Sequence, residues 1–283
     1  MKMYVICLSH DIDAVEHPYS SPRGLLRSAA RPGTWGLLLN YLTRKPSARS
    51  NPYDTFDKIL DLEKRYRAKS TFFAPPVNWE VNINYVRKLR DSGWEVALHA
   101  AGGSHVSVCK LVEQKEILEK ILGSEVFGVR QHRLDLMIPR TFEFERASGF
   151  KYDSSYFPPR YARERMYRPF VAVEGLVEIP LAFMDSDFSE MTLTRSNGIE
   201  RTWKRIERIL EEYRRNEGVC TVLWHPHAFY DEKNDFHKAY YTHFKGFTEL
   251  YERILEYGSR NSDKMCGCLE VLRSSRTLKK SMW

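Results

Sequence analysis

Short apolar runs alternate along the chain with longer segments in which apolar residues recur at helical spacing. Most of the runs are apolar throughout rather than alternating with polar residues, which is typical of strands buried in a parallel sheet. Turn residues bound them, as expected for strands. We expect strands at residues 4–8, 70–74, 94–98, 126–130, 177–179, 219–224 and 269–272.

The segments between these runs have the periodicity of amphipathic helices. We expect helices at residues 53–66, 81–91, 108–122, 141–148, 199–216 and 247–257. Gly93, Gly123 and Gly149 follow three of them, as C-terminal caps commonly do. Alternating strands and helices predict an α/β barrel, and one barrel of about 250 residues fits this length. No repeat or linker divides the chain, so residues 1–283 are expected to form one domain.

Residues 17–52 interrupt this pattern directly after the first strand. The segment contains five prolines, three glycines and several arginines, and it fits neither a strand nor a long helix. Such a composition is typical of an excursion from the core. We expect a lid-like insertion here, with a short helix near residues 35–39.

Composition excludes several classes of protein. With 42% hydrophobic and 29% charged residues, the chain is neither disordered nor of low complexity. Five cysteines, an odd number, argue against a disulfide framework. The sequence lacks an apolar run long enough for a transmembrane helix or a signal peptide, so we expect a cytoplasmic protein. The net charge of +7 favours anionic neighbours such as phosphate, although no nucleic-acid-binding motif is present.

Polar residues follow several of the predicted strands. Asp11 and Asp13 come after the first strand, and His99 comes after the strand at 94–98. His105 lies six residues further, beyond a loop with two glycines, and Arg130 ends the strand at 126–130. Because active sites in such folds form at the C-terminal ends of the strands, we expect these side chains to gather there.

Three further histidines belong to the same end of the predicted barrel. His132 follows Arg130, and His225 and His227 follow the strand at 219–224. A histidine at this place is suited to act as a general acid near neutral pH, and only one of the last two needs to face the site. His132 is a candidate metal ligand or substrate-binding residue.

Two acids, several histidines and an arginine fit metal-assisted hydrolysis. One carboxylate can bind a metal ion while the other takes a proton from water. Imidazoles suit zinc and similar ions, and an arginine can keep a carboxylate base ionised. No serine-hydrolase elbow or phosphate-binding loop offers a competing mechanism.

The residues around the first strand resemble the polysaccharide deacetylase superfamily, the NodB-homology carbohydrate esterases. The acidic pair in His10-Asp11-Ile12-Asp13 is similar to the first motif of the branch that carries Asp-x-Asp. The resemblance implies that Asp11 is the base and Asp13 a metal ligand. The family's second motif has three residues between two histidines, whereas five separate His99 and His105 here. His132 or water is the alternative to His105 as a ligand beside His99.

The later motifs resemble the family as well. The third implies that Arg130 orients the base, and the fourth is similar to residues 149–155, in which Tyr152 and Asp153 would line the substrate groove. The fifth resembles Leu223-Trp224-His225 and implies that His225 is the acid, with His227 in reserve.

The resemblance implies a distorted (β/α)7 barrel, a divalent transition metal such as zinc, and removal of an acetyl group from an N-acetylated sugar or glycan. The basic net charge is, separately, consistent with a phosphate-linked substrate. Two other functions stay open. The Asp-x-Asp form also occurs in cyclic-amide hydrolases, so a cyclic imide or ureide is an alternative substrate. The irregular histidine spacing also allows an inactive barrel that binds glycan or nucleic acid.

Overall fold

A computed structural model describes residues 3–12, 55–75, 83–158, 166–188, 197–230 and 245–275. The predicted insertion at 17–52, with its short helix, lies outside the described residues, and so does Asp13.

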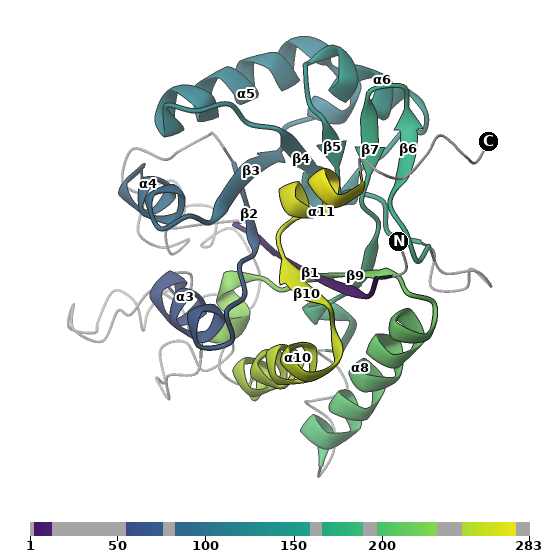
Figure 1. Ribbon diagram of the computed structural model, residues 1–283. Coiled ribbons are helices and arrows are strands. Elements are labelled where there is room, and N and C mark those ends of the chain that lie inside the picture. The colour runs from purple at the N-terminus through teal and green to yellow at the C-terminus, as the bar shows by residue number, and fades with distance from the viewer. Residues whose placement is uncertain are drawn as a thin grey trace, which may run out of the picture.

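The core of the molecule is a curled ten-stranded sheet (Figure 1). Its strands are β1 (Val5–Asp11), β2 (Thr71–Ala74), β3 (Glu95–Ala100), β4 (Gly128–Gln131), β5 (Tyr152–Asp153), β6 (Phe170–Val173), β7 (Leu176–Glu178), β8 (Leu181–Met184), β9 (Val219–Leu223) and β10 (Lys264–Cys266). Their order is β6-β7-β5-β4-β3-β2-β1-β9-β8, and β10 pairs with the first half of β1. All pairs are parallel except β6 with β7.

Helices cover the outer face of the curled sheet (Figure 1). They are α3 (Phe56–Arg65), α4 (Ile83–Asp91), α5 (Val108–Leu122), α6 (Arg140–Ala147), α8 (Gly198–Arg215) and α10 (Phe247–Asn261). Short 3-10 turns follow four strands: η2 (Ser104–Val106), η3 (His132–Leu134), η4 (Asp185–Phe188) and η5 (Pro226–Phe229). The predicted distorted barrel of alternating strands and helices is therefore confirmed.

The six helices lie close to their predicted positions. Helix α5 matches its predicted bounds, and Gly123 follows it with the left-handed φ of 66° that favours glycine at this place. The helices obtain their stability from apolar faces packed on the sheet, which is why periodicity located them. None of the described helices is long and apolar enough to span a bilayer.

The side chains of β1 alternate between two separate cores. Ile6 and Leu8 belong to the large core between the sheet and the outer helices. Val5 and Cys7 belong to a smaller core inside the barrel. Because side chains alternate along a strand, Asp11 faces the barrel interior with Val5 and Cys7.

The prediction of a last strand at 269–272 is wrong. These residues belong to helix α11 (Cys268–Ser275), which lies inside the curve of the sheet (Figure 1). Cys268, Val271 and Leu272 are buried in the small inner core, at the spacing of one helical face. The apolar run is short, so its periodicity alone did not distinguish a buried helix from a strand. The strand that precedes it, β10, was not predicted, and neither were β5, β6 and β8.

Candidate active site

The carboxylate of Asp11 lies at the C-terminal end of β1 and pairs with a buried arginine. Arg130 Nη1 donates to Asp11 Oδ1 at 2.7 Å, and the Asp11 side chain is 5% exposed. Arg130 faces the same interior from β4. A buried ion pair of this kind fixes the orientation of both partners, and removing one of them leaves an uncompensated charge.

Arg130 is held by further contacts that leave its guanidinium little freedom. Its Nε donates to the Ser154 carbonyl at 2.7 Å, its Nη2 to Ser154 Oγ at 2.8 Å, and its Nη1 also to Ser9 Oγ at 3.0 Å. The guanidinium lies over the Phe73 ring, 4.0 Å from the centroid. Burial opposes its charge, but Asp11 raises the pKa of Arg130 above its ordinary value. The arginine is therefore a fixed cation beside Asp11.

A second carboxylate holds His225 just beyond β9. Asp185 in η4 accepts a hydrogen bond from the His225 backbone N–H at 2.7 Å and lies 2.9 Å from its Nδ1. Asp185 is 1% exposed, whereas the His225 side chain is 15% exposed. Burial would raise the pKa of Asp185, but the charge and hydrogen bonds of His225 outweigh it and lower the pKa. The carboxylate fixes the ring of His225 through Nδ1.

The register of the sheet brings these two pairs together. Ser9 of β1 lies opposite Leu223 of β9 in a parallel pair. Asp11 and His225 each come two residues later, so both project from the same face at the same end of adjacent strands. Each has its own counter-charge, Arg130 for Asp11 and Asp185 for His225.

Two histidines lie together at the ends of β3 and β4. His99 is opposite Arg130 in the β3–β4 pair, and its Nδ1 lies 3.2 Å from the Arg130 carbonyl oxygen. The rings of His99 and His132 meet edge to face, with centroids 5.3 Å apart. Two imidazoles this close can offer nitrogen atoms to one ion.

His105 lies in η2, the turn after β3, where its backbone carbonyl accepts a hydrogen bond from Thr141 Oγ1 at 2.9 Å. Within the described ranges, no three His, Cys, Asp or Glu side chains are grouped so that they could hold a metal ion.

Comparison with known proteins agrees with this architecture. No family model matches the chain, and no curated protein matches it. Among solved structures, a Mycobacterium smegmatis protein provisionally assigned as a polysaccharide deacetylase has a TM-score of 0.64 at 18% identity, over 98% of this chain and 91% of that one. A similarly assigned protein from Pseudomonas aeruginosa PAO1 has a TM-score of 0.60 at 16% identity, over 99% and 94%.

The chain has the polysaccharide deacetylase fold. A Puue allantoinase shares this fold, with a TM-score of 0.58 at 13% identity over 99% of this chain and 93% of that one. At these identities the similarity establishes the fold only.

Two of the predicted substrate-binding residues lie elsewhere in this polysaccharide deacetylase fold. Tyr152 is fully buried, and its hydroxyl donates at 2.7 Å to Glu95, which begins β3 at the opposite end of the barrel. Asp153 is fully buried on the outer face of β5 and accepts hydrogen bonds from the backbone N–H and hydroxyl of Ser155. Neither Tyr152 nor Asp153 is therefore placed to contact a substrate at the strand ends. His227 does lie at the site, stacked on His225 with centroids 5.1 Å apart.

Sequence reasoning missed Asp185. Its signal was available, because Asp185 directly follows an apolar run, Leu181–Met184, just as Asp11 ends one. That run was not identified as a strand, so the acid after it was not considered. The polysaccharide deacetylase fold places β8 beside β9, which brings Asp185 to His225.

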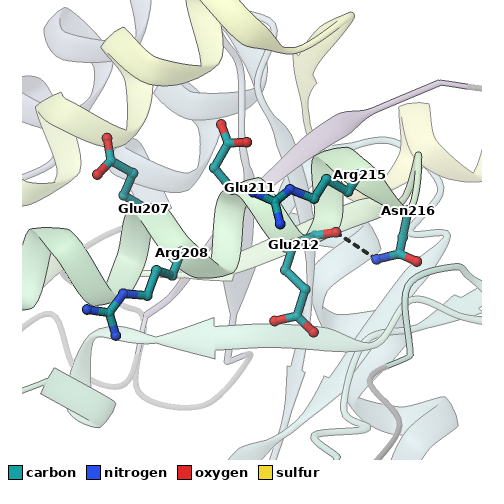
Figure 2. A pocket seen from close by; sticks show the side chains of 6 residues that line it. All are labelled: Glu207, Arg208, Glu211, Glu212, Arg215 and Asn216. Atoms are coloured by element: carbon teal, nitrogen blue, oxygen red, sulfur yellow. Dashed lines mark hydrogen bonds between the residues drawn. The ribbon is translucent and has the colours of Figure 1, made fainter.

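The depression drawn in Figure 2 is a different feature. It has a volume of about 540 Å³ and lies along the last turns of α8, lined by side chains between Glu207 and Asn216. Five of the six lining residues belong to that helix and the sixth, Asn216, is its C-cap, and none of them is a predicted site residue. The candidate site residues lie at the strand ends instead.

Proposed function

We propose that the protein is a metal-dependent amide hydrolase that removes the acetyl group from an N-acetylated sugar or glycan. One observation carries this proposal: a carboxylate paired with a buried arginine and a histidine paired with a buried carboxylate end adjacent parallel strands. Such pairs give one group suited to accept a proton and one suited to donate a proton, as hydrolysis of an amide requires.

Asp11 is the proposed base. It takes a proton from the water that attacks the acetyl carbonyl carbon. Arg130 places a positive charge beside the carboxylate, and the 2.7 Å hydrogen bond fixes the orientation of Asp11. The orientation matters, because a base must be within reach of the proton it abstracts.

His225 is the proposed acid. Its Nδ1 is held by Asp185, so Nε2 is the nitrogen suited to give a proton to the leaving amine as the carbon–nitrogen bond breaks. The carboxylate of Asp185 stabilises the protonated ring and fixes its tautomer, in the manner of an acid–histidine pair in other hydrolases. The buried carboxylate favours His225 over its stacked neighbour His227.

The donor set fits a divalent transition ion. His99 and His132 would supply imidazole nitrogens, and Asp13, two residues beyond Asp11, would supply a carboxylate oxygen. Such an ion, when bound, polarises a carbonyl and lowers the pKa of water. The ring contact supports His132, rather than His105, as the second histidine.

The substrate class rests on the solved relatives and on charge. Two of them are provisionally assigned as polysaccharide deacetylases, which supports an N-acetylated sugar. The net charge of +7 supports a phosphate-linked one. In that case the KM would rise between low and physiological ionic strength, because salt screens exposed charges; a KM independent of salt would contradict the phosphate.

Metal content with matched histidine variants tests the proposed site. We expect about one equivalent of zinc or a similar ion in the purified protein. His99→Ala and His132→Ala each remove a ligand and should lose the ion, while His105→Ala should retain it. Atomic emission on the three purified variants gives the measurement, and circular dichroism controls for folding. Retention in His132→Ala with loss in His105→Ala would reverse the ligand assignment.

A cyclic imide or ureide is the second candidate substrate, supported by the fold shared with an allantoinase. Both reactions cleave a carbon–nitrogen bond next to a carbonyl, so the same base and acid serve either. Release of acetate from N-acetylated sugars, set against ring opening of small cyclic amides, distinguishes the two. Absence of metal after zinc is supplied, with neither activity, would instead favour the binding barrel.

A further inference from the structure

His10 lies next to Asp11 but on the opposite face of β1. It is fully buried in the outer core, against the rings of Phe72, Phe229 and Tyr251, with centroids 4.7, 5.9 and 5.6 Å away. A histidine in such surroundings needs partners for both ring nitrogens. Its two partners are Trp224, directly after β9, and Glu63 of α3, and they determine which ring nitrogens carry hydrogen.

The first partner is a backbone carbonyl. His10 Nδ1 lies 2.5 Å from the carbonyl oxygen of Trp224. A carbonyl oxygen accepts hydrogen bonds and cannot donate one, so the hydrogen must be on Nδ1.

The second partner is the carboxylate of Glu63, whose Oε1 lies 2.9 Å from His10 Nε2. Glu63 is buried, yet it accepts hydrogen bonds from the backbone N–H and hydroxyl of Ser70, from Trp94 Nε1 and from the Tyr251 hydroxyl. Burial alone would raise the pKa of Glu63, but the hydrogen bond and charge of His10 and the hydrogen bonds of Trp94 and Tyr251 lower it overall.

Glu63 is therefore an ionised acceptor surrounded by donors, and the hydrogen between it and His10 belongs to Nε2. Tyr251 does not supply it, because its one hydrogen goes to Glu63 at 2.8 Å, while Tyr251 Oη is 3.3 Å from His10 Nε2. With hydrogens on both nitrogens, His10 is an imidazolium ion in a buried pair with Glu63.

We propose that His10 is a positioning residue, an imidazolium ion anchored by Glu63 that fixes the strand of the base to the strand of the acid. This role rests on the proposed function. The residue before Asp11 holds the residue before His225. The Trp224 backbone is bound on both sides, since its N–H also donates to the Ser9 carbonyl at 2.9 Å.

Helix α3 extends this attachment past the end of β9. Thr55, the N-cap of α3, donates through Oγ1 to the Pro226 carbonyl at 2.6 Å, while Glu63 within the helix holds His10. His225 thus lies between Trp224, whose carbonyl is bound by His10, and Pro226, whose carbonyl is bound by Thr55. An active-site group held this way is already in its reactive geometry, so it loses little conformational entropy at each turnover.

Two substitutions separate the two bonds of His10. The amide nitrogen of asparagine coincides with Nδ1, so His10→Asn keeps a donor for Trp224 and loses the one for Glu63. The longer glutamine reaches the position of Nε2, so His10→Gln keeps the donor for Glu63 and loses the one for Trp224. If His10 acts by positioning, kcat should fall about tenfold more in His10→Gln than in His10→Asn, with KM changed less than about twofold in both.

Tyr257→Phe is the matched control. Its hydroxyl donates to Glu211 and joins α10 to α8 next to the depression of Figure 2, away from the strand ends. It loses a partly buried hydrogen bond and should leave kcat unchanged. Equal losses of kcat in the two His10 variants, or a comparable loss in the control, would contradict positioning and leave only a general loss of stability.

Nuclear magnetic resonance of labelled histidines tests the proposal without turnover. In the wild-type protein both His10 ring nitrogens should have the chemical shifts of protonated nitrogens, and the ring signals of His225 should move in His10→Gln but not in Tyr257→Phe. One unprotonated nitrogen in His10, or unmoved His225 signals, overturns the proposal even if the variants fold poorly. Absence of hydrolysis with these signals as expected would contradict the proposed function and leave the ion pair standing.

Discussion

Two groups of buried carboxylates in this molecule differ in what neutralises them. At the C-terminal ends of the strands, Asp11 pairs with Arg130 and Asp185 with His225. Between the sheet and α6, Glu145, Asp153 and Glu178 are fully buried beside one another. In the described part of the chain, no Lys, Arg or His side chain forms a salt bridge with this second group, which we call the outer acid cluster.

The difference in counter-charge reverses the effect of burial. Burial raises the pKa of Glu145 and of Glu178 well above the ordinary value, and the charge of Asp153 adds to it. Asp185 is as deeply buried, but its pKa is lowered because the charge and hydrogen bonds of His225 outweigh burial. Asp185 therefore favours the ionised form, whereas the outer acid cluster favours neutral, protonated acids.

Hydrogen bonding agrees with this distinction. Glu145 Oε2 and Glu178 Oε2 have no hydrogen-bond partner among the described residues. A buried, ionised carboxylate oxygen without a hydrogen bond destabilises the folded protein, whereas a protonated carboxyl group can donate a hydrogen bond to a neighbouring acid. Buried acids are thus not equivalent as candidates for catalysis, and the counter-charge decides which of them can act as a base.

Among the variants that test this comparison, Asp11→Asn is expected to have the largest effect on activity. The amide keeps an oxygen for Arg130 but cannot accept a proton from water, so kcat should fall by about 10³-fold. Metal content should be unchanged, because Asp11 is not a proposed ligand. Steady-state kinetics beside atomic emission checks both. A kcat near that of the wild type would mean that the paired carboxylate at the strand end is not the base.

Asp185→Asn should have the next largest effect. The amide can still bind the His225 backbone N–H, but it no longer stabilises a protonated ring, so we expect a fall in kcat of about 10²-fold. The acidic side chain of Asp187 in the same turn gives the matched control, since its Oδ2 accepts from the Met184 N–H. Asp187→Asn should leave the pH–rate profile in place, and a profile altered equally by both variants would contradict the pairing of Asp185 with His225.

The sequence was sufficient for the features that depend on local pattern. Helical periodicity located α5 and α8, and the rule that sites form at strand ends selected Asp11, His99 and Arg130. It could do so because Asp11 and Arg130 occur at the ends of apolar runs that form strands. The pairing of Asp11 with Arg130 was also predicted, from the chemistry of an arginine beside a carboxylate.

Features that depend on the face of the sheet to which a side chain points were not predictable from the sequence. Tyr152 and Asp153 follow a glycine in a segment resembling a family motif, yet β5 is two residues long and its position in the sheet comes from β4 and β7. His10 and Asp11 are neighbours with opposite directions, and only the split between the two cores shows which is inside. The choice between His105 and His132 depends on the geometry of η2 and η3, which spacing in the sequence does not determine.

The smallest effect is expected from changes in the outer acid cluster, and it concerns the stability of the protein rather than its activity. Because folded-state pKa values are raised there, the folded protein binds protons more tightly than the unfolded chain. The stabilisation is fully present below the ordinary carboxyl range near pH 4.5 and is lost as pH rises through the raised values. Unfolding free energy should therefore decrease from about pH 5 to about pH 8 through this cluster.

Glu145→Gln removes one ionisable group of the outer acid cluster and keeps the shape of the side chain. The new amide oxygen can still accept the 2.7 Å hydrogen bond from Gln131 Nε2. At about pH 8 the variant should be more stable than the wild type by on the order of 1 kcal/mol, with a smaller difference at about pH 5. Urea unfolding at both pH values measures this, with the exposed neighbour in Glu143→Gln as the control on the same helix. A variant that is less stable at the higher pH would show that Glu145 is ionised in the folded protein, and the contrast with Asp185 would then fail, because a buried acid without a local counter-charge would have kept its charge.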